Sequence, residues 1–196
     1  ADAIRLCDEG LARIVDPDTE LESAPDGTPA SADFGDLIVS ECFIPQIVYS
    51  TTWGMRNDVA EWNGAMPSSV CDVFDTDKFP GKRAILPNAL NNMEWGAYCS
   101  RSFNRDQASV YAMLETEKGQ QAALDMWSSI KDDLVFAASA ADVPQLLQDG
   151  EVVMGSTYNG RLFALIAEGG VDNVEMLWDA QVFDLDGWIV PANLPA

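Results

Sequence analysis

The sequence predicts an α/β fold whose sheet is mainly parallel. Short runs rich in apolar and β-branched residues alternate along the chain with helix-like segments of modest length, and this alternation is typical of strands joined by crossover helices. The chain has 196 residues, of which 47% are hydrophobic, so it can bury a substantial core. Nowhere do about 18 apolar residues run together, and a membrane-spanning helix is therefore not expected.

The N-terminal quarter is expected to hold a short helix, a loop and a strand. Residues 2–15 form a helix that Gly10 stops, followed by an extended segment. Residues 16–33 are rich in Pro, Asp, Ser and Gly, which indicates a surface loop. Residues 43–49 are rich in β-formers and predict a strand that runs into the small residues 50–52.

The remaining segments are expected to alternate between helices and strands. Helices are predicted where a capping residue precedes a mixed apolar and polar run, and strands where short β-rich runs stand between turns. The expected helices are 68–74, 88–98, 106–114, 116–131, 142–148 and 158–168. The expected strands are 84–86, 134–136, 151–154, 174–178 and 181–190.

The composition excludes several classes of function. The chain carries 11 Lys and Arg against 32 Asp and Glu, a net charge of -21, which disfavours binding to nucleic acid or insertion at an anionic membrane. This acidity either attracts cationic solutes or serves as a solvated surface that maintains solubility. Histidine is absent, so catalytic triads and His-based zinc sites are excluded. No motif for other catalysis stands out, and we predict no enzyme, no cofactor and no metal site.

The four cysteines stand at Cys7, Cys42, Cys71 and Cys99, without the CxxC spacing of a zinc ribbon or a redox pair. Four cysteines allow three disulfide connectivities. Cys7 with Cys42 is the favoured pair because both lie in the N-terminal segment, in keeping with an oxidising compartment. Buried free thiols are the alternative, and a bond between Cys71 and Cys99 stays open.

Four segments in a shared order and spacing carry a resemblance to a known family. They are Phe74 to Arg83, Pro144 to Met154, Tyr158 to Arg161, and Asp184 to Pro191, with weaker support from Cys7 to Gly10 and from Glu41-Cys42. The chain resembles the polyamine-type (spermidine/putrescine) periplasmic solute-binding proteins of ABC transporters over nearly its whole length.

The resemblance implies a type II periplasmic-binding-protein-like fold, with two α/β lobes joined by crossing strands and the ligand trapped between them. Residues 1–55 then hold part of lobe one and the outgoing strand. Residues 56–182 build lobe two, and residues 183–196 return to lobe one. Lobe one is expected to be incomplete, because its first strands and helices and its closing helices have no counterpart in this sequence.

The resemblance also implies a function and partners. The protein would capture a small, amine-containing solute, such as a polyamine, in the periplasm and deliver it to the membrane permease of an ABC importer. Closure of the lobes on the solute would be the signal that the transporter reads. One alternative is a ligand-sensing or enzymatic domain on the same scaffold, and another is an acidic module that binds cationic partners through its surface.

The resemblance assigns ligand contacts to Tyr158 and Asp186. The aromatic residue at the position of Tyr158 faces the cleft and packs on the ligand, where its ring attracts an ammonium. It can equally be a core residue. The acid at the position of Asp186 pairs with a ligand amine, and Asp184 lies two residues away on the same strand face. Arg161 could meet a ligand carboxylate, but pairing with a surface acid is favoured.

The sequence departs from the polyamine binders after the strand at 84–86. Asn88, Ala89, Asn91 and Asn92 stand where those proteins carry acidic residues, and Glu94 follows one turn later. Asn88, Asn92 and Glu94 are candidate ligand contacts, and the amides suit a zwitterion or a less charged amine as well as a polyamine.

The outgoing strand supplies the last candidates. Tyr49 and Ser50 are candidate ligand contacts on the hinge side, with Trp53 as a further possibility, although alternate strand positions also bury aromatic residues in the core.

Overall fold

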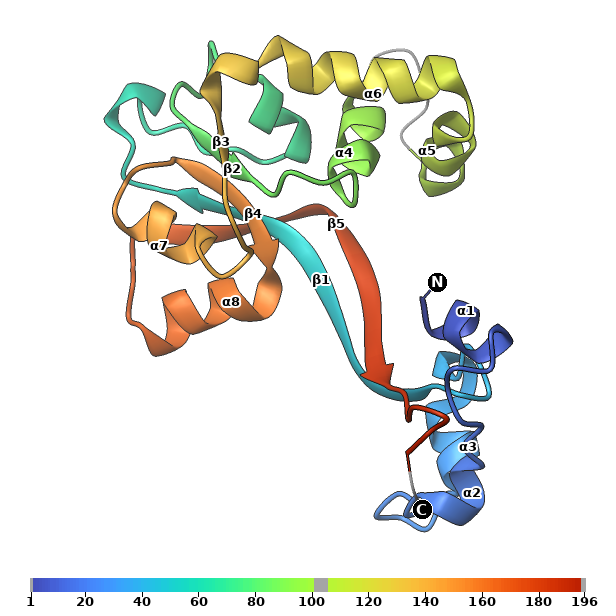
Figure 1. The fold of residues 1–196 in the computed structure, drawn as a ribbon. Helices are drawn as coiled ribbons and strands as arrows, with labels where there is room; N and C mark the ends of the chain where they lie inside the picture. The colour runs from blue at the N-terminus through green and yellow to red at the C-terminus, as the bar shows by residue number, and fades with distance from the viewer. Residues whose placement is uncertain (1, 101–105, 195–196) are drawn as a thin grey trace. The chain divides into compact units, whose positions relative to one another are not determined.

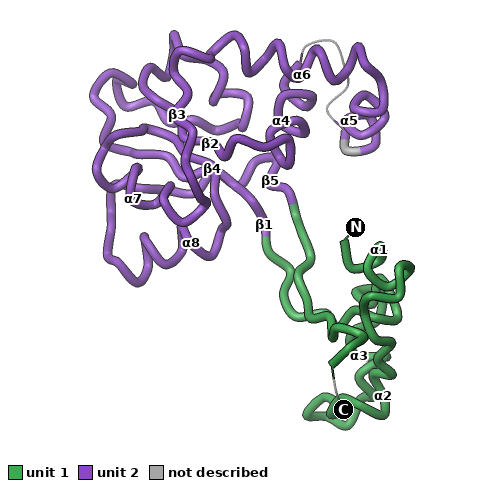
Figure 2. The backbone as a smooth tube through the Cα atoms, viewed as in Figure 1, with its two compact units in different colours: residues 1–49, 183–196 green, residues 50–182 purple. Residues whose placement is uncertain are grey.

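The computed structural model describes residues 2–100 and 106–194, and its elements are drawn in Figure 1. The chain divides into two compact units (Figure 2). Unit 1 comprises Ala1–Tyr49 and Phe183–Ala196, and unit 2 comprises Ser50–Val182. Two long strands, β1 (Ile44–Arg56) and β5 (Val174–Trp188), have residues in both units.

Unit 2 is built on a mixed sheet with the strand order β3-β2-β4-β1-β5. The strand β2 (Arg83–Ile85) pairs in parallel with β3 (Leu134–Phe136) and with β4 (Met154–Tyr158). β1 runs antiparallel to β4, with Thr51 opposite Tyr158 and Met55 opposite Met154. The expected α/β fold is confirmed, and its sheet is parallel over the three strands β3, β2 and β4.

Helices cover both faces of this sheet (Figure 1). One face is covered by α4 (Asn92–Cys99), α6 (Glu117–Ser129) and the 3-10 helix η3 (Val70–Phe74). The other is covered by α7 (Val143–Gln148) and by α8 (Asn159–Phe163), which continues as a π-helix over Ala164–Glu168. The helix α5 (Gln107–Leu114) packs on α4 and α6. The smaller 3-10 turns of unit 2 are Ala60–Trp62 and Lys131–Asp133.

Alternate positions along β1 supply the two cores of unit 2 because successive side chains of a strand point to opposite faces. Trp53 packs into the first core with Trp95 and Trp127, at ring-centroid distances of 5.3 Å and 6.4 Å. Gly54 faces the second core, where an added Cβ would lie 2.6 Å from Leu162. Only a glycine lets that layer approach the strand so closely.

The segment that precedes β2 is held by a buried arginine. Arg83 is fully buried, and its guanidinium donates hydrogen bonds to the carbonyls of Val73, Phe79 and Gly81. Burial lowers the pKa of Arg83, but a guanidinium stays protonated in proteins. The loop carbonyls thus satisfy a charge that would otherwise be costly to bury.

Unit 1 consists of short helices and the outer parts of β1 and β5. Its helices are α1 (Asp2–Asp8), α2 (Pro17–Glu20), α3 (Ala30–Phe34) and the 3-10 turn η1 (Gly35–Leu37). A disulfide joins Cys7 to Cys42, and an isolated β-bridge pairs Ala12 with Pro191. In unit 2 a second disulfide joins Cys71 to Cys99 and so ties η3 to α4.

The expected loop at 16–33 was wrong in part because it holds two short helices. Asp16 caps α2 by accepting a hydrogen bond from the backbone N–H of Asp18, and Pro17 takes the first helical position, which proline favours. The side chain of Asp18 then accepts from the backbone N–H and the hydroxyl of Ser31, in α3. Helix capping and side-chain hydrogen bonds therefore stabilise two short helices in a segment whose composition predicts a loop.

The boundaries of α4 and β4 also differ from the expected ones. Asn92 donates from its side chain to the carbonyls of Leu86 and Asn88, which closes a loop and delays the start of α4 from residue 88 to residue 92. β4 starts at Met154 because the N–H groups of Glu151 and Val152 bond to the carbonyl of Leu146 at the end of α7. The expected strand at 151–154 is therefore mostly turn.

The expected strands at 174–178 and 181–190 are one strand, β5, with a kink between them. Ala180 has a φ of 50°, a left-handed conformation that is unusual for a residue with a side chain. Its carbonyl accepts a hydrogen bond of 2.9 Å from the indole Nε1 of Trp95. This contact holds the kink against α4. None of the helices in the described ranges is both long and apolar enough to cross a membrane.

Candidate functional site

Open α/β sheets bind ligands outside the carboxyl ends of their parallel strands, so these ends form the candidate ligand-binding edge of unit 2. β2 ends at Ile85 and β4 at Tyr158. β1 is antiparallel to β4, so its residues Ser50 and Thr51 lie at the same edge. We call residues 50–51, 86–91 and 158–159 the carboxyl edge.

Side-chain hydrogen bonds connect the segments of the carboxyl edge. The side-chain amide of Asn91 donates to the hydroxyl oxygen of Thr51 over 3.0 Å. The backbone N–H of Ser50 donates to the side-chain oxygen of Asn159 over 3.2 Å. The hydroxyl of Ser50 is buried and makes no hydrogen bond within the described part of the chain. These bonds fix β1 to the loop before α4 and to the start of α8, and the hydroxyl of Ser50 remains unsatisfied among the described residues.

Tyr158 lies at the centre of this edge, as the N-cap residue of α8, and its side chain is half-buried. The guanidinium carbon of Arg161 is 5.7 Å from the centre of the tyrosine ring, a distance at which a cation is attracted by the ring face. Of the ion pairs among the described residues, none includes Arg161. The Tyr158 ring thus already receives a cation in this structure.

The two asparagines predicted as ligand contacts differ in their surroundings. Asn88 is exposed on the carboxyl edge. Asn92 is buried, and its side-chain nitrogen donates to two backbone carbonyls, each over 2.8 Å. A side-chain amide nitrogen has two hydrogens to donate, so this one is fully used in shaping the loop that presents Asn88.

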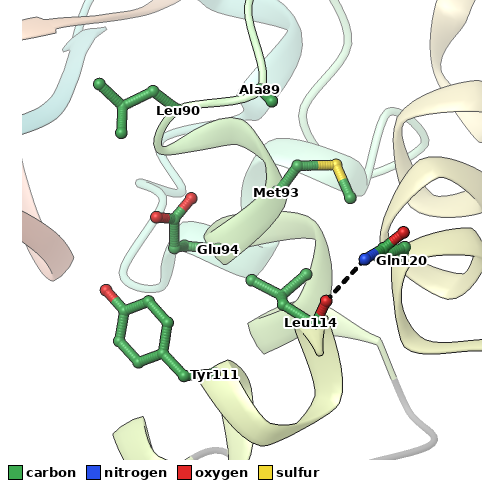
Figure 3. A pocket seen from close by; sticks show the side chains of 7 residues that line it. All are labelled: Ala89, Leu90, Met93, Glu94, Tyr111, Leu114 and Gln120. Carbon is green, nitrogen blue, oxygen red and sulfur yellow. Dashed lines mark hydrogen bonds between the residues drawn. The ribbon is translucent and has the colours of Figure 1, made fainter. Parts of the chain in front are cut away.

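Glu94 lies in a hollow on unit 2 with a volume of about 520 Å³ (Figure 3). The lining residues are Ala89, Leu90, Met93, Glu94, Tyr111, Leu114 and Gln120. The carboxylate of Glu94 and the hydroxyl of Tyr111 point toward the same space in Figure 3. Burial and the negative charge of Glu94 both raise the pKa of the Tyr111 hydroxyl. Glu94 therefore belongs to a different set of side chains from Tyr158.

The remaining candidates lie in unit 1. The hydroxyl of Tyr49 donates to Oδ2 of Asp184 over 3.3 Å. Asp184 and Asp186 are both exposed, and each accepts the N–H of the next residue through Oδ1 at 2.8 Å. The structure thus brings Tyr49 together with Asp184, and it brings Ser50 together with Asn159 beside Tyr158.

Sequence reasoning missed two contributions to these surfaces. The bond between Thr51 and Asn91 joins residues 40 positions apart, and Tyr111 reaches Glu94 only because α5 packs on α4. Such pairings depend on tertiary structure and leave no local signal. Across residues 2–100 and 106–194, no group of three or more acidic or cysteine side chains could hold a metal ion.

Comparisons with known proteins agree with this architecture. The family described as bacterial extracellular solute-binding proteins matches residues 1–196. A gamma-aminobutyric acid-binding protein from Pseudomonas aeruginosa is 30% identical over 192 residues, which cover 98% of this chain and 50% of that protein.

Solved structures with the same fold include two at or above 25% identity. The periplasmic protein MotA from A. tumefaciens B6, solved in complex with glucopine, is 29% identical with a TM-score of 0.74, over 93% of this chain and 52% of that one. A GABA receptor is 25% identical with a TM-score of 0.71, over 96% of this chain and 52% of that one. The chain spans about half the length of the relatives it matches.

Proposed function

Since the chain belongs to the family of bacterial extracellular solute-binding proteins, we propose that it binds a small, amine-bearing solute in the periplasm for delivery to an ABC importer. The observation that carries the proposal is the half-buried ring of Tyr158 at the carboxyl edge, with a cation already over its face. A solute ammonium would replace the guanidinium of Arg161 over the ring, where a cation is stabilised by about 0.5 to 2 kcal/mol. The relatives are solute-binding proteins and not enzymes.

Acidic groups of unit 1 and polar groups of unit 2 are proposed as further ligand contacts, each within its own unit. Asp186 and Asp184 are proposed to accept charge-assisted hydrogen bonds from the amine, which are about twice as strong as neutral ones. Tyr49 orients Asp184 through its hydroxyl. Ser50 and Asn88 are proposed to contact the uncharged or anionic part of the solute, because both are neutral and lie at the carboxyl edge.

The solute is proposed to carry a single amine. A polyamine needs an acidic partner for each ammonium, whereas the loop of the carboxyl edge offers amides at Asn88 and Asn91. A gamma-aminobutyric acid-binding protein and a glucopine complex are among the relatives, which supports an amine that is accompanied by other polar groups. The polyamine class that the motifs predict is the alternative that the same experiment tests.

Isothermal titration of the full-length gene product that contains these residues tests the proposal directly. The titrants are gamma-aminobutyric acid, putrescine and spermidine, with acetate as a solute that lacks an amine. We expect saturable binding of the first and weaker binding of the two polyamines. Tyr158→Ala should lower the affinity about tenfold, which corresponds to about 1.4 kcal/mol, because the ring face is lost.

Matched variants separate a ligand role from a general effect. Phe163→Ala removes an exposed aromatic side chain from the same helix, and Asp172→Asn removes one exposed carboxylate elsewhere in the chain. These should leave the affinity unchanged, whereas Asp186→Asn should lower it. The proposal is wrong if no amine binds, or if Tyr158→Ala and Asp186→Asn behave like their controls. Tighter binding of spermidine would restore the polyamine class.

A further inference from the structure

The hollow between α4, α5 and α6 has the composition of a small-molecule site. Its volume of about 520 Å³ lies within the range of about 300 to 1,000 Å³ that is usual for ligand pockets. Aliphatic side chains form most of its wall, contributed by Ala89, Leu90, Met93 and Leu114. Leu90 is 60% exposed, so an apolar ligand beside it would remove apolar surface from water.

The polar groups of the hollow set the charge of its ligand. Among the described residues that line the hollow, Glu94 is the single charged side chain, and it takes part in none of the ion pairs found in the described part of the chain. Gln120 uses its side-chain nitrogen to donate to the carbonyl of Leu114 over 2.9 Å (Figure 3). The hydroxyl of Tyr111 points toward the same space as the carboxylate of Glu94 (Figure 3). Because its pKa is raised, Tyr111 stays neutral at neutral pH and adds no second charge to the hollow.

We propose that this hollow is a second binding site, selective for a monoamine with an apolar body. The ammonium pairs with the carboxylate of Glu94 and lies beside the ring of Tyr111, while the carbon chain covers Leu90, Met93 and Leu114. The site goes beyond the solute binding proposed for Tyr158, and neither Tyr158 nor the acids of unit 1 line it.

The charge count in the hollow distinguishes this ligand from its close relatives. A neutral alcohol leaves the carboxylate of Glu94 without a partner in a partly desolvated place. A carboxylate ligand is repelled by Glu94. A diamine of the same length satisfies Glu94 with one end but places its second ammonium against aliphatic side chains, where desolvation is unfavourable. A monoamine avoids each of these costs.

The test uses the methyl group of Met93 as a local reporter. The chain has seven methionines, so labelling with ¹³C-methyl methionine gives a simple spectrum, in which the Met93→Leu variant identifies the Met93 signal. The probes are pentylamine, cadaverine, pentanol and pentanoate, which share a five-carbon chain and differ in charge. We expect pentylamine to shift the Met93 signal saturably. Its affinity should be about tenfold higher than that of any other probe, which corresponds to a difference of about 1.4 kcal/mol in binding free energy.

Variants assign the selectivity to the carboxylate. Glu94→Gln keeps the shape and removes the charge, and it should reduce the affinity for pentylamine to that for pentanol. Glu115→Gln removes the charge of an exposed glutamate at the end of α5 that does not line the hollow, and it should leave the affinity unchanged.

Three outcomes would overturn the proposal. They are an unmoved Met93 signal, equal affinities for pentylamine and pentanol, and a Glu94→Gln variant that binds pentylamine like the parent. Tyr158 does not line the hollow, so pentylamine should shift the Met93 signal equally in the parent and in Tyr158→Ala, which separates this result from binding of gamma-aminobutyric acid at Tyr158.

Discussion

Unit 2 buries its apolar side chains in layers, whereas unit 1 leaves many of its large ones exposed. Among the described residues, 25 of the 30 buried hydrophobic side chains belong to unit 2. Ten of the 16 exposed large hydrophobic side chains belong to unit 1, which holds only 63 of the 196 residues. The unit with the smaller share of the chain therefore has the larger share of the exposed large hydrophobic residues among those described.

The charge distribution sharpens this contrast. Unit 1 has 13 acidic and 2 basic residues, a net charge of -11, and unit 2 has 19 acidic and 9 basic residues, a net charge of -10. Self-repulsion per residue is thus greater in unit 1, where the core that opposes it is smaller. Small cores usually depend on covalent staples. We therefore expect equal perturbations to have unequal consequences in the two units.

The two disulfides give the largest test of this comparison. Their closed loops are similar, with sequence separations of 35 and 28, so chain entropy assigns each a stabilisation of about 4 kcal/mol. We expect Cys7→Ser with Cys42→Ser to unfold unit 1 because little else holds it. The double variant of Cys71 and Cys99 should only lower the stability of unit 2. Hydrogen exchange measured by mass spectrometry, peptide by peptide, distinguishes the two results.

The control for this experiment lies within each variant. Peptides from unit 2 should keep their protection when the bond between Cys7 and Cys42 is removed, because that bond lies wholly in unit 1. Retained protection in residues 2–43 would show that unit 1 has a sufficient core without the staple. Complete loss of protection in unit 2 after removal of the other bond would also contradict the comparison.

A single buried cation gives the second test, in unit 2. Arg83→Met leaves the carbonyls of Val73, Phe79 and Gly81 without their donor, and each unsatisfied buried group costs about 1 to 3 kcal/mol. We expect a loss of about 3 kcal/mol in the free energy of unfolding, measured by urea denaturation with tryptophan fluorescence.

Arg13→Met is the matched change in unit 1. Arg13 pairs with Glu20 at 2.6 Å, but both side chains are at least one-third exposed, and such pairs contribute about 0 to 1 kcal/mol. Its effect on the urea midpoint should be small. If Arg83→Met were as mild as Arg13→Met, the loop before β2 would be held by other contacts.

The difference between Arg83 and Arg13 shows where sequence reasoning reaches its limit. Alternation and caps predicted the helices at 106–114, 116–131 and 142–148 closely, because their signals are local. No local pattern in the sequence indicated that Arg83 is buried. Arginine is almost never fully buried unless its donors are satisfied, and the carbonyls that accept from Arg83 are brought into place only by the fold of the preceding loop.

The candidate site shows the same limit. The motif order led to Tyr158, and strand order places Ser50 and Asn88 at the same edge of the sheet. The sequence could not show that the side-chain amide of Asn92 would donate both its hydrogens to carbonyls of the loop, nor that Tyr111 would line the same hollow as Glu94. Both facts follow from how α4 packs against the loop before it and against α5, which periodicity does not encode.

The smallest expected effect compares one type of hydrogen bond in the two units. In unit 1, hydrogen bonds from the backbone N–H and then the hydroxyl of Ser31 lower the pKa of Asp18. In unit 2, the hydroxyl and then the backbone N–H of Ser109 lower the pKa of Asp106. The Asp18 contact joins α2 to α3 across 13 positions, whereas the Asp106 contact caps α5 within 3.

A lowered carboxylate pKa stabilises the folded state above the unfolded value of about 3.9, and this contribution is lost as the pH falls through the folded pKa. Ser31→Ala and Ser109→Ala should each raise the pKa of the partner carboxylate, which a ¹³C NMR titration of the side-chain carboxyl measures. Only Ser31→Ala should also increase hydrogen exchange between its two helices at neutral pH, because unit 1 has few other contacts there. Equal exchange in the two variants would mean that the units differ less in local stability than their cores indicate.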